Sequence, residues 1–352
     1  MPRNDMTIRL AGEAGQGVES GGAGFAKALT DAGLWLHTTS EFMSRIRGGL
    51  NFFQARVAEH PLYSHVEKVH LLLAFSEEAV TENVGAVVPG GAVLYDEGFK
   101  LKADVITRHG VQAFPAPLTR LAQEVGGNKI MMNTCALGAT AGLTDFDFQY
   151  IADIIKTNFR RKGDAVVESN LKVARAGYDY ARQQYGVKFE WKISPLAGTP
   201  PRMVINGNQA IGVGALAAGC KFCSGYPMTP SSSIIEYIAS QATRFGVVMK
   251  QTEDEVAALL MAIGAGYAGA RAMTATSGGG FALMTEAIGL AGMAEVPVVI
   301  AESQRPGPST GMPTKTEQGD LLFCVHASQG EFPKIVLAVS TIEDCFALSA
   351  RA

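Results

Sequence analysis

Short apolar runs alternate with longer amphipathic stretches along the first half of the chain. The apolar runs predict strands at Thr7–Ala11, Asn51–Val57, Val69–Phe75, Ala92–Asp96 and Asp104–Thr107. Helical spacing of apolar residues predicts helices from Val18 to about Ala32 and at Glu77–Val84, Leu118–Glu124, Asn133–Gly142, Asp145–Lys162 and Ala165–Tyr185. Strands that alternate with helices predict an α/β fold with helices on both faces of a sheet.

The second half repeats this alternation after a break. Residues 186–202 contain Pro195, Pro200 and Pro201 and show no periodicity, so we interpret them as a linker between domains 1–185 and 203–352. Helices are then expected at Gln209–Ala218, Ile234–Phe245 and Glu255–Gly269, from Ser277 to about Gly292, and at Ile342–Ala350. Strands are expected before Tyr226 and at Val247–Gln251, Ala272–Thr276, Pro297–Glu302 and Lys334–Ala338. The pattern predicts a doubly wound sheet, and the chain is expected to stop before this domain is complete.

Composition and charge narrow the function classes. The 352 residues carry a net charge of -3, so no global field favours nucleic acid. Only 18% of the residues are charged, which indicates large cores or burial against partner chains. The polar N-terminus does not resemble a secretory signal, and no uncharged run is long enough to span a bilayer. The protein is therefore expected in the cytoplasm.

The cysteines do not form a recognisable ligand set. Five cysteines are widely spaced, and Cys220 and Cys223 are the only close pair. A lone pair of this spacing can be redox-active, but no second pair completes a zinc or iron–sulfur site. The sequence favours two buried thiols and no metal site in this chain.

The stretch Tyr226–Ser233 combines a stiff turn with a helix start. Each proline ring flanking Thr229 fixes its own φ and keeps the residue before it out of the helical region. Ser233 and Glu236 fit a capping box at the start of the next helix. Thr229 is therefore expected at a helix N-terminus, where free N–H groups attract an anion. An ordinary capped helix start explains the same pattern.

A second glycine-rich turn follows the first predicted strand. It contains Gly15, Gln16 and Gly17, with the spacing G-x-x-G-x-G instead of the dinucleotide pattern, and no Walker lysine follows. Strand, glycine turn and helix form a phosphate-binding layout, although a tight turn also needs glycine for its backbone. Further on, Arg45 and Arg47 belong to a basic loop that either holds an anion or is simply solvated.

Three polar groups of the second half are expected on one rim. Ligands of an open α/β sheet bind at the loops beyond the carboxyl ends of its strands. Thr229, Glu255 and Arg305 each follow a predicted strand there. The arginine fork matches both oxygens of a carboxylate. Glu255 alone is explained by a first-turn acid that complements the helix dipole, but its convergence with the other two favours a binding site.

These residues carry a family resemblance. The stretches Gly225–Ser232, Glu253–Ala258, Thr274–Gly278 and Arg305–Thr314 resemble the alpha subunit of 2-oxoacid:ferredoxin oxidoreductases. The first half, with Gly12–Val18 and Arg45–Gly49, resembles the gamma domain of the same family. The resemblance implies that this domain contributes to the coenzyme A site. The order gamma then alpha is typical of 2-oxoglutarate:ferredoxin oxidoreductase. Residues 203–352 would then form the pyrimidine-binding domain of a thiamine diphosphate site.

The resemblance implies roles for single residues. Glu255 would hydrogen-bond the aminopyrimidine ring of the cofactor and so act in catalysis. Thr229 and Arg305 would hold the C1 carboxylate of the 2-oxoacid, and Thr314 would lie near its far end. The remaining expected cofactor contacts are Tyr226, Pro227, Thr276, Ser277 and Gly278. Gly15, Gln16, Gly17, Arg45 and Arg47 would contribute to the coenzyme A site.

The resemblance also implies a partner subunit. The chain has no Gly-Asp-Gly motif for Mg²⁺ and the diphosphate, and no cysteine set for a 4Fe–4S cluster. Both are expected on a beta subunit that shares the thiamine diphosphate, in a dimer of heterodimers that passes electrons to ferredoxin. The implied reaction is the oxidative decarboxylation of a 2-oxoacid with coenzyme A to acyl-CoA, CO₂ and reduced ferredoxin. The order gamma then alpha favours 2-oxoglutarate as the substrate and succinyl-CoA as the product.

Alternatives stay open at this point. Pyruvate or a branched-chain 2-oxoacid fits the same motifs, and the sequence fixes neither the substrate nor the direction of the reaction. A non-catalytic scaffold that binds coenzyme A or a nucleotide would use the glycine turn of the first half, but it does not require Thr229, Glu255 and Arg305 together. A transketolase-type thiamine enzyme does not account for the gamma-like half.

Overall fold

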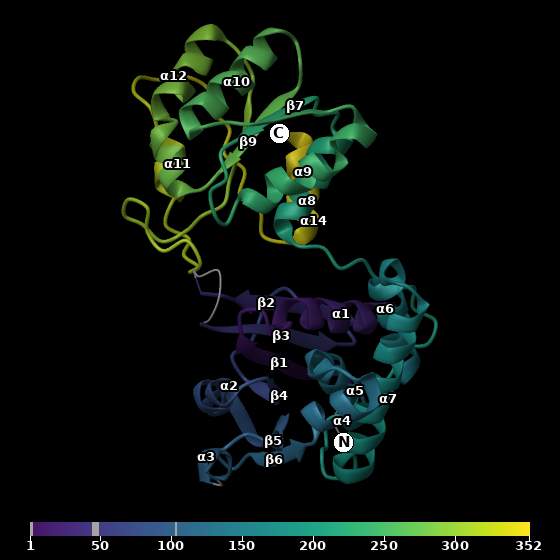
Figure 1. The fold of residues 1–352 in the computed structure, drawn as a ribbon. Coiled ribbons are helices and arrows are strands. Elements are labelled where there is room, and N and C mark those ends of the chain that lie inside the picture. Colours follow the sequence, from purple (N-terminus) through teal and green to yellow (C-terminus); the bar gives the residue numbers. More distant parts are fainter. Residues whose placement is uncertain (1–2, 44–48, 103) are drawn as a thin grey trace. The chain divides into compact units, whose positions relative to one another are not determined.

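The computed structural model describes residues 3–43, 49–102 and 104–352, and the chain divides into two compact units, Met1–Val204 and Ile205–Ala352 (Figure 1). Each unit contains a sheet of its own with helices packed on it. The α/β class predicted for both halves is confirmed.

The sheet of unit 1 mixes strand directions. Its described strands have the order β2-β3-β1-β4-β5-β6. β3 runs antiparallel to both of its neighbours, whereas β1, β4, β5 and β6 are parallel. The strand bounds are Met6–Glu13 (β1), Trp35–Glu41 (β2), Leu50–Ala58 (β3), Val69–Ala74 (β4), Val87–Asp96 (β5) and Gln112–Ala116 (β6). The parallel strands therefore present their carboxyl ends at one edge.

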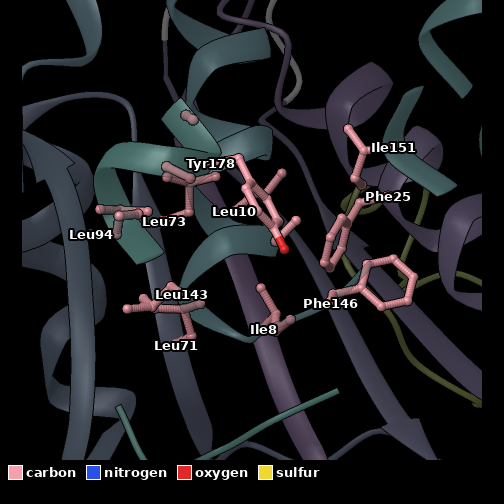
Figure 2. Packing of buried hydrophobic residues seen from close by; sticks show 14 of the residues in the cluster. Ile8, Leu10, Phe25, Leu71, Leu73, Leu94, Leu143, Phe146, Ile151 and Tyr178 are labelled. Carbon is pink, nitrogen blue, oxygen red and sulfur yellow. The ribbon is translucent and has the colours of Figure 1, made fainter. Parts of the chain in front are cut away.

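Two cores lie on opposite faces of this sheet because side chains alternate along a strand. In β4, Leu71 and Leu73 enter one core, and Leu72 and Ala74 enter the other. Figure 2 shows the larger core, to which Leu71 and Leu73 belong together with aromatic side chains such as Tyr178. The helices that contribute to it are α1 (Val18–Asp31), α4 (Leu118–Gly126), α5 (Met132–Leu143), α6 (Phe148–Phe159) and α7 (Asp164–Tyr185). The second core is closed by α2 (Glu77–Asn83) and α3 (Asp104–Thr107), and short 3₁₀ turns occupy Val84–Ala86, Lys129–Met131 and Arg160–Lys162.

Glycines bring α5 and α7 into backbone contact. A Cβ atom at Gly138 would overlap the carbonyl oxygen of Ala174, and one at Gly142 would overlap that of Tyr178. From the other helix, a Cβ at Gly177 would overlap the carbonyl oxygen of Cys135. The two helices therefore pack more closely than any larger residue at these positions allows.

Residues 186–202, interpreted from the sequence as a linker, are part of unit 1 and pack against its larger core. Phe189 and Ile193 are fully buried in the larger core. The Lys192 ammonium group donates to the carbonyl oxygen of Leu143 at 3.0 Å, at the end of α5. The Arg202 guanidinium group lies 3.6 Å from the centroid of the Trp35 ring.

Two predictions for unit 1 need correction. Asp104–Thr107 is the helix α3 and not a strand, and the strand of this region is β6, Gln112–Ala116, which the sequence analysis missed. The apolar run around Ile106 was too short to separate the two states, and Ile106 is buried in either case. β2 was also missed, because its residues are mostly half-buried and polar. Arg45 and Arg47 lie outside the described residues.

Unit 2 has a parallel sheet covered on both faces. Its described strands are β7 (Phe222–Gly225), β8 (Val248–Gln251), β9 (Ala272–Thr276) and β10 (Val299–Glu302), in the order β10-β9-β7-β8. One core forms between the sheet and α8 (Gly207–Ala217) and α9 (Ser232–Phe245), and α14 (Ile342–Arg351) packs on α8. The other core contains residues of α10 (Glu255–Tyr267), α11 (Gly278–Leu283), α12 (Thr285–Ala294) and α13 (Leu321–His326).

Two features of unit 2 differ from the prediction. Lys334–Ala338 is not a strand, because it pairs with no described strand, and Ile335 is 87% exposed. A strand needs a partner for its N–H and C=O groups, which an apolar run alone does not specify. The predicted helix up to Gly292 is divided at Met284 into α11 and α12, and α13 was not predicted.

The contact between α5 and α7 makes a direct prediction about stability. Gly138→Ala should lower the free energy of unfolding by about 1–3 kcal/mol, because its Cβ meets backbone atoms that cannot turn aside. Gly21→Ala in α1 is the control, since its Cβ would lie an ordinary 3.6 Å from Leu137. The control should be neutral or gain up to about 1 kcal/mol from alanine's helix propensity. Equal denaturation midpoints for the two variants would contradict the close packing.

Candidate functional site

Four loops meet at the carboxyl edge of the sheet in unit 2. Because β7, β8, β9 and β10 are parallel, the segments that follow Gly225, Gln251, Thr276 and Glu302 all leave from this edge. Ligands of open α/β sheets bind there. The predicted residues Thr229, Glu255 and Arg305 lie on three of these segments.

The turn after β7 is held by hydrogen bonds from two directions. The Ser231 hydroxyl donates to the carbonyl oxygen of Met228 at 2.6 Å. From α8, the Asn208 side chain donates to the carbonyl oxygen of Pro230 at 2.8 Å and to the Ser233 hydroxyl at 2.9 Å. The Thr229–Pro230 peptide bond is cis. The hydrogen bonds from Ser231 and Asn208 fix the backbone on both sides of Thr229.

The predicted capping box at Ser233 is wrong. α9 begins at Ser232, and its N-cap is Ser231, whose side chain makes no capping bond. The Ser231 hydroxyl is used by the turn, and Ser233 lies within the first helical turn. Ser233 and Glu236 have the spacing of a capping box, but the Ser233 hydroxyl accepts a hydrogen bond from Asn208 on α8 instead of capping α9.

Glu255 is a buried acid with an unpartnered oxygen. It is the first residue of α10, and the N-cap is Asp254, whose side chain accepts from the Ala257 N–H at 2.6 Å. Glu255 is only 3% exposed, and its Oε1 atom has no hydrogen-bond partner among the described residues. Buried carboxyl groups normally find donors within the chain, so this oxygen is free for a ligand.

Arg305 joins the loop after β10 to the turn after β7. Its Nη1 atom donates to the carbonyl oxygen of Thr229 at 2.7 Å. The side chain is 6% exposed, and its Nε atom has no partner among the residues that the structure describes. A buried guanidinium group with a free donor is suited to bind an anion.

Three consecutive glycines separate the charged groups of the site. A Cβ at Gly280 would lie 2.9 Å from Glu255 Oε1, and one at Gly278 would lie 2.6 Å from Asp320 Oδ2. A Cβ at Gly279 would lie 3.8 Å from Arg305 Nη2 and 3.9 Å from Met228 Cε. The start of α11 therefore touches the acid, the arginine and the turn, and only glycine fits at its first and third positions.

The other expected cofactor contacts vary in exposure. Thr276 and Ser277 are fully buried, and Ser277 Oγ is also unpartnered within the described chain. Gly278 begins α11, while Tyr226 is 38% exposed and Pro227 is exposed in the turn. Thr314 is half-buried further along the Arg305 loop, and no described hydrogen bond connects its side chain to Thr229 or Arg305.

Sequence reasoning missed an acidic pair beside this cluster. Glu302 ends β10 and Asp320 is the N-cap of α13, and one oxygen of each lacks a donor among the described residues. Burial, the charge of Asp320 and a hydrogen bond to it raise the pKa of Glu302 to about 8. The available signal was a glutamate at the last position of an apolar strand.

In unit 1 the glycine turn has an internal explanation. Gly17 has a φ of 81° as the N-cap of α1, and Gly15 has a φ of 96°. The Gln16 side chain accepts from the Glu13 N–H at 2.8 Å, so it stabilises the turn itself. A cavity of about 380 Å³ lies elsewhere in this unit, lined by Asp96, Glu97, Gly98, Pro117, Thr119, Arg120, Gln123, Glu124 and Lys129.

Cys220 and Cys223 are buried free thiols, as predicted. Burial raises the pKa of Cys223 to about 12 and also raises the pKa of Cys220. Within the described ranges, no group of three or more His, Cys, Asp or Glu residues is arranged to hold a metal ion. No helix in the described part of the chain is long and apolar enough to cross a membrane.

Family models match both units. Residues 7–180 match the pyruvate ferredoxin/flavodoxin oxidoreductase family, and residues 213–352 match the family described as pyruvate flavodoxin/ferredoxin oxidoreductase, thiamine diP-bdg. The second match covers Thr229, Glu255 and Arg305.

Relatives match almost the whole chain. The 2-oxoacid:ferredoxin oxidoreductase subunit alpha of a Sulfolobus species is 30% identical over 96% of this chain and 60% of the relative. The 2-oxoglutarate synthase subunit KorA of Archaeoglobus fulgidus is 48% identical over 42% of this chain and 43% of the relative. The solved 2-oxoglutarate:ferredoxin oxidoreductase of Magnetococcus marinus, with 2-oxoglutarate, coenzyme A and succinyl-CoA bound, is 35% identical with a TM-score of 0.89, over 99% of this chain and 60% of that chain. The chain thus spans about 60% of the length of the first curated relatives that it matches.

The unpartnered oxygen of Glu255 predicts a gain in stability on substitution. Glu255→Gln should raise the free energy of unfolding by about 1–2 kcal/mol, because a buried amide of equal size costs less to desolvate than a carboxyl group without a donor. Glu253→Gln is the matched control, since Glu253 is exposed and should change stability by less than about 0.5 kcal/mol. The check is a denaturant titration of the three proteins. A loss of stability in Glu255→Gln would mean that the chain itself satisfies the carboxyl group.

Proposed function

The chain belongs to the 2-oxoacid:ferredoxin oxidoreductase alpha-subunit family, and from this we propose that it forms part of an enzyme that converts 2-oxoglutarate and coenzyme A into succinyl-CoA and CO₂ with reduction of ferredoxin. The observation that supports the proposal most is the pairing of two unsatisfied buried groups at one sheet edge. Glu255 offers a free carboxyl oxygen, and Arg305 offers a free N–H donor. Between them lie glycines that leave room beside each group.

The residues present fit thiamine diphosphate as the cofactor. Glu255 Oε1 is a buried polar atom without a protein partner, as expected of a group that hydrogen-bonds a ligand. We assign Glu255 to the ring nitrogen of the aminopyrimidine, to which its carboxyl group would hydrogen-bond. Tyr226, Pro227, Thr276, Ser277 and Gly278 would line the remainder of this cofactor site. When bound, thiamine diphosphate supplies the carbon nucleophile and electron sink that decarboxylation of a 2-oxoacid requires.

Arg305 and Thr229 are assigned to the C1 carboxylate of the substrate. The bond from Arg305 Nη1 to the Thr229 carbonyl oxygen orients the guanidinium group and leaves Nε as a donor. Burial excludes water from this charge, which strengthens its bond to a carboxylate. Thr314 on the same loop would contact the far end of the 2-oxoacid.

We propose that a beta subunit completes the site. It would carry Mg²⁺, the diphosphate contacts and the 4Fe–4S cluster, and a dimer of such heterodimers would reduce ferredoxin. The naming of the relatives as alpha subunits supports a multi-subunit enzyme. A location in the cytoplasm is proposed for the complex, since all five cysteines are free thiols.

Unit 1 is assigned to the coenzyme A side, as a gamma-type domain over residues 1–185, with residues 186–202 connecting it to the pyrimidine-binding domain at 203–352. The glycine turn at Gly15, Gln16 and Gly17 precedes α1, whose free N–H groups favour a phosphate. Arg45 and Arg47 would add positive charge.

A substrate panel tests the proposed function. The chain, purified with its beta subunit, should form succinyl-CoA from 2-oxoglutarate, coenzyme A and a low-potential electron acceptor. Pyruvate and a branched-chain 2-oxoacid should be poorer substrates, and the chain without its partner should be inactive. Preferred turnover of pyruvate would overturn the substrate assignment, and thiamine-dependent turnover by the chain alone would overturn the shared site.

The same assay measures the grip of Arg305 on the substrate. Arg305→Lys should raise KM for 2-oxoglutarate, because lysine lacks the planar fork. Arg305→Ala should lower kcat/KM further. The expected loss of transition-state stabilisation is about 2–5 kcal/mol, as for one partner of a buried charge pair. Arg244→Ala is the control, since Arg244 is exposed at the end of α9. An unchanged KM in both Arg305 variants would remove this residue from the substrate site.

The role of Glu255 is measured without substrate. In the assembled complex, Glu255→Gln should slow hydrogen–deuterium exchange at C2 of the cofactor by about 10²–10⁴-fold, the usual size of general acid–base effects. Binding of thiamine diphosphate, measured by isothermal titration calorimetry, shows separately whether the site still loads. Glu253→Gln should exchange normally, since its exposed side chain lies outside the site. Slow exchange in Glu253→Gln with normal exchange in Glu255→Gln would show that Glu253, and not Glu255, has this role.

A further inference from the structure

The loop that carries Arg305 is closed at its base. It runs from the end of β10 at Glu302 to Asp320, the N-cap of α13, and contains no helix or strand. The Asp320 N–H donates to Gln304 Oε1 at 2.9 Å, so the first and last residues of the loop are joined. Inside the loop, the Met312 N–H donates to the Pro306 carbonyl oxygen at 3.1 Å. Residues 303–319 therefore form a compact loop whose two ends meet.

Two carboxyl groups lie side by side at this base. Glu302 Oε1 and Asp320 Oδ2 are both inaccessible to solvent, and neither has a donor among the described residues. Two ionised carboxyl groups in contact repel, and neither can donate to the other. One proton on the pair removes the repulsion and supplies the missing hydrogen bond. Burial and then the neighbouring Asp320 raise the pKa of Glu302 to about 8, so the pair keeps this proton near neutral pH.

The surroundings offer no described cation that would replace the proton. The Cys324 thiol on α13 interacts with both acids, and burial, Glu302 and Asp320 raise its pKa to about 11. Lys334, the charged neighbour of Cys324, donates to the Ala327 carbonyl oxygen at 2.5 Å. β9 pairs Thr276 with Glu302, and α11 places the backbone of Gly278 against Asp320, so both elements present neutral groups.

We propose that Glu302 and Asp320 share one proton, and that this shared proton keeps the loop 303–319 closed and Arg305 in position for the 2-oxoacid. The positioning role rests on the proposed function, whereas the proton sharing does not. Glu302 and Asp320 act through Arg305, three residues after Glu302, and they are positioning residues. The proton is present below a pH of about 8 and is lost as the pH rises further. Without it, the two negative charges push the base of the loop apart.

Amide hydrogen exchange tests the proton sharing in the complex with the beta subunit. After correction for intrinsic exchange rates, amide protection of peptides from 306–319 should fall about 5–10-fold between about pH 7 and about pH 9, because the protonated fraction falls tenfold for each unit above the pKa. Peptides from α9 should show no such change. Glu302→Gln and Asp320→Asn each place an amide donor between the two groups that does not titrate, so their protection should stay constant.

Glu317→Gln is the matched control. Glu317 is an exposed acid on the same loop, so this variant should lose protection with pH as the unaltered protein does. Equal loss of protection in Glu302→Gln, or a constant protection in the unaltered protein, would overturn the shared proton. If one amide variant is poorly folded, the other variant still tests the shared proton, because the two substitutions lie on different elements.

Kinetics separate this inference from the proposed function. In the active complex, KM for 2-oxoglutarate should rise with pH over the same range, and Glu302→Gln should remove that rise with little change in kcat. A rise that persists in Glu302→Gln would overturn the positioning role. If protection follows pH as expected while KM does not, the shared proton stands and the assignment of Arg305 to the substrate carboxylate is overturned.

Discussion

The hydrogen bond from Arg305 Nη1 to the carbonyl oxygen of Thr229, at 2.7 Å, connects two loops of the candidate site. It joins the loop after β10 to the turn after β7, across 76 positions of sequence. The turn after β7 is also held by Asn208 of α8, which donates to the carbonyl oxygen of Pro230. Because the guanidinium group is buried, this charge-assisted bond forms where competition from water is weak. The bond thereby orients the arginine and leaves Nε available for an anion.

The glycine run Gly278–Gly280 brings the backbone of α11 against three charged side chains of the site. Each of its residues faces a different charged side chain, namely Asp320, Arg305 and Glu255 in that order. A side chain at the first or third position would displace a carboxyl group, so the site requires backbone there instead of side chains. The same three residues begin α11, which connects the site directly to the core below it through Phe281.

Close contacts have different consequences in the two units. In unit 1, the glycines of α5 and α7 bring backbone against backbone, and the contact contributes to stability through packing alone. In unit 2, close approach leaves buried polar atoms unpaired, on Glu255, Ser277, Glu302, Arg305 and Asp320. Each such atom costs about 1–3 kcal/mol, and a protein retains costs of this kind where binding or catalysis recovers them. Among the described residues, His37 Nδ1 is such an atom in unit 1, and the others all lie in unit 2.

The sequence by itself determined most helices and strands, the α/β class and the positions of Thr229, Glu255 and Arg305 after strands of one sheet, because periodicity and turn chemistry are local properties. It did not determine that 104–107 is helical, that 334–338 is unpaired, or that Ser231 and not Ser233 precedes α9. Only the tertiary structure decided that Glu302 meets Asp320 and that Arg305 reaches Thr229. These contacts depend on strand order and on donors from distant elements, which no local pattern contains.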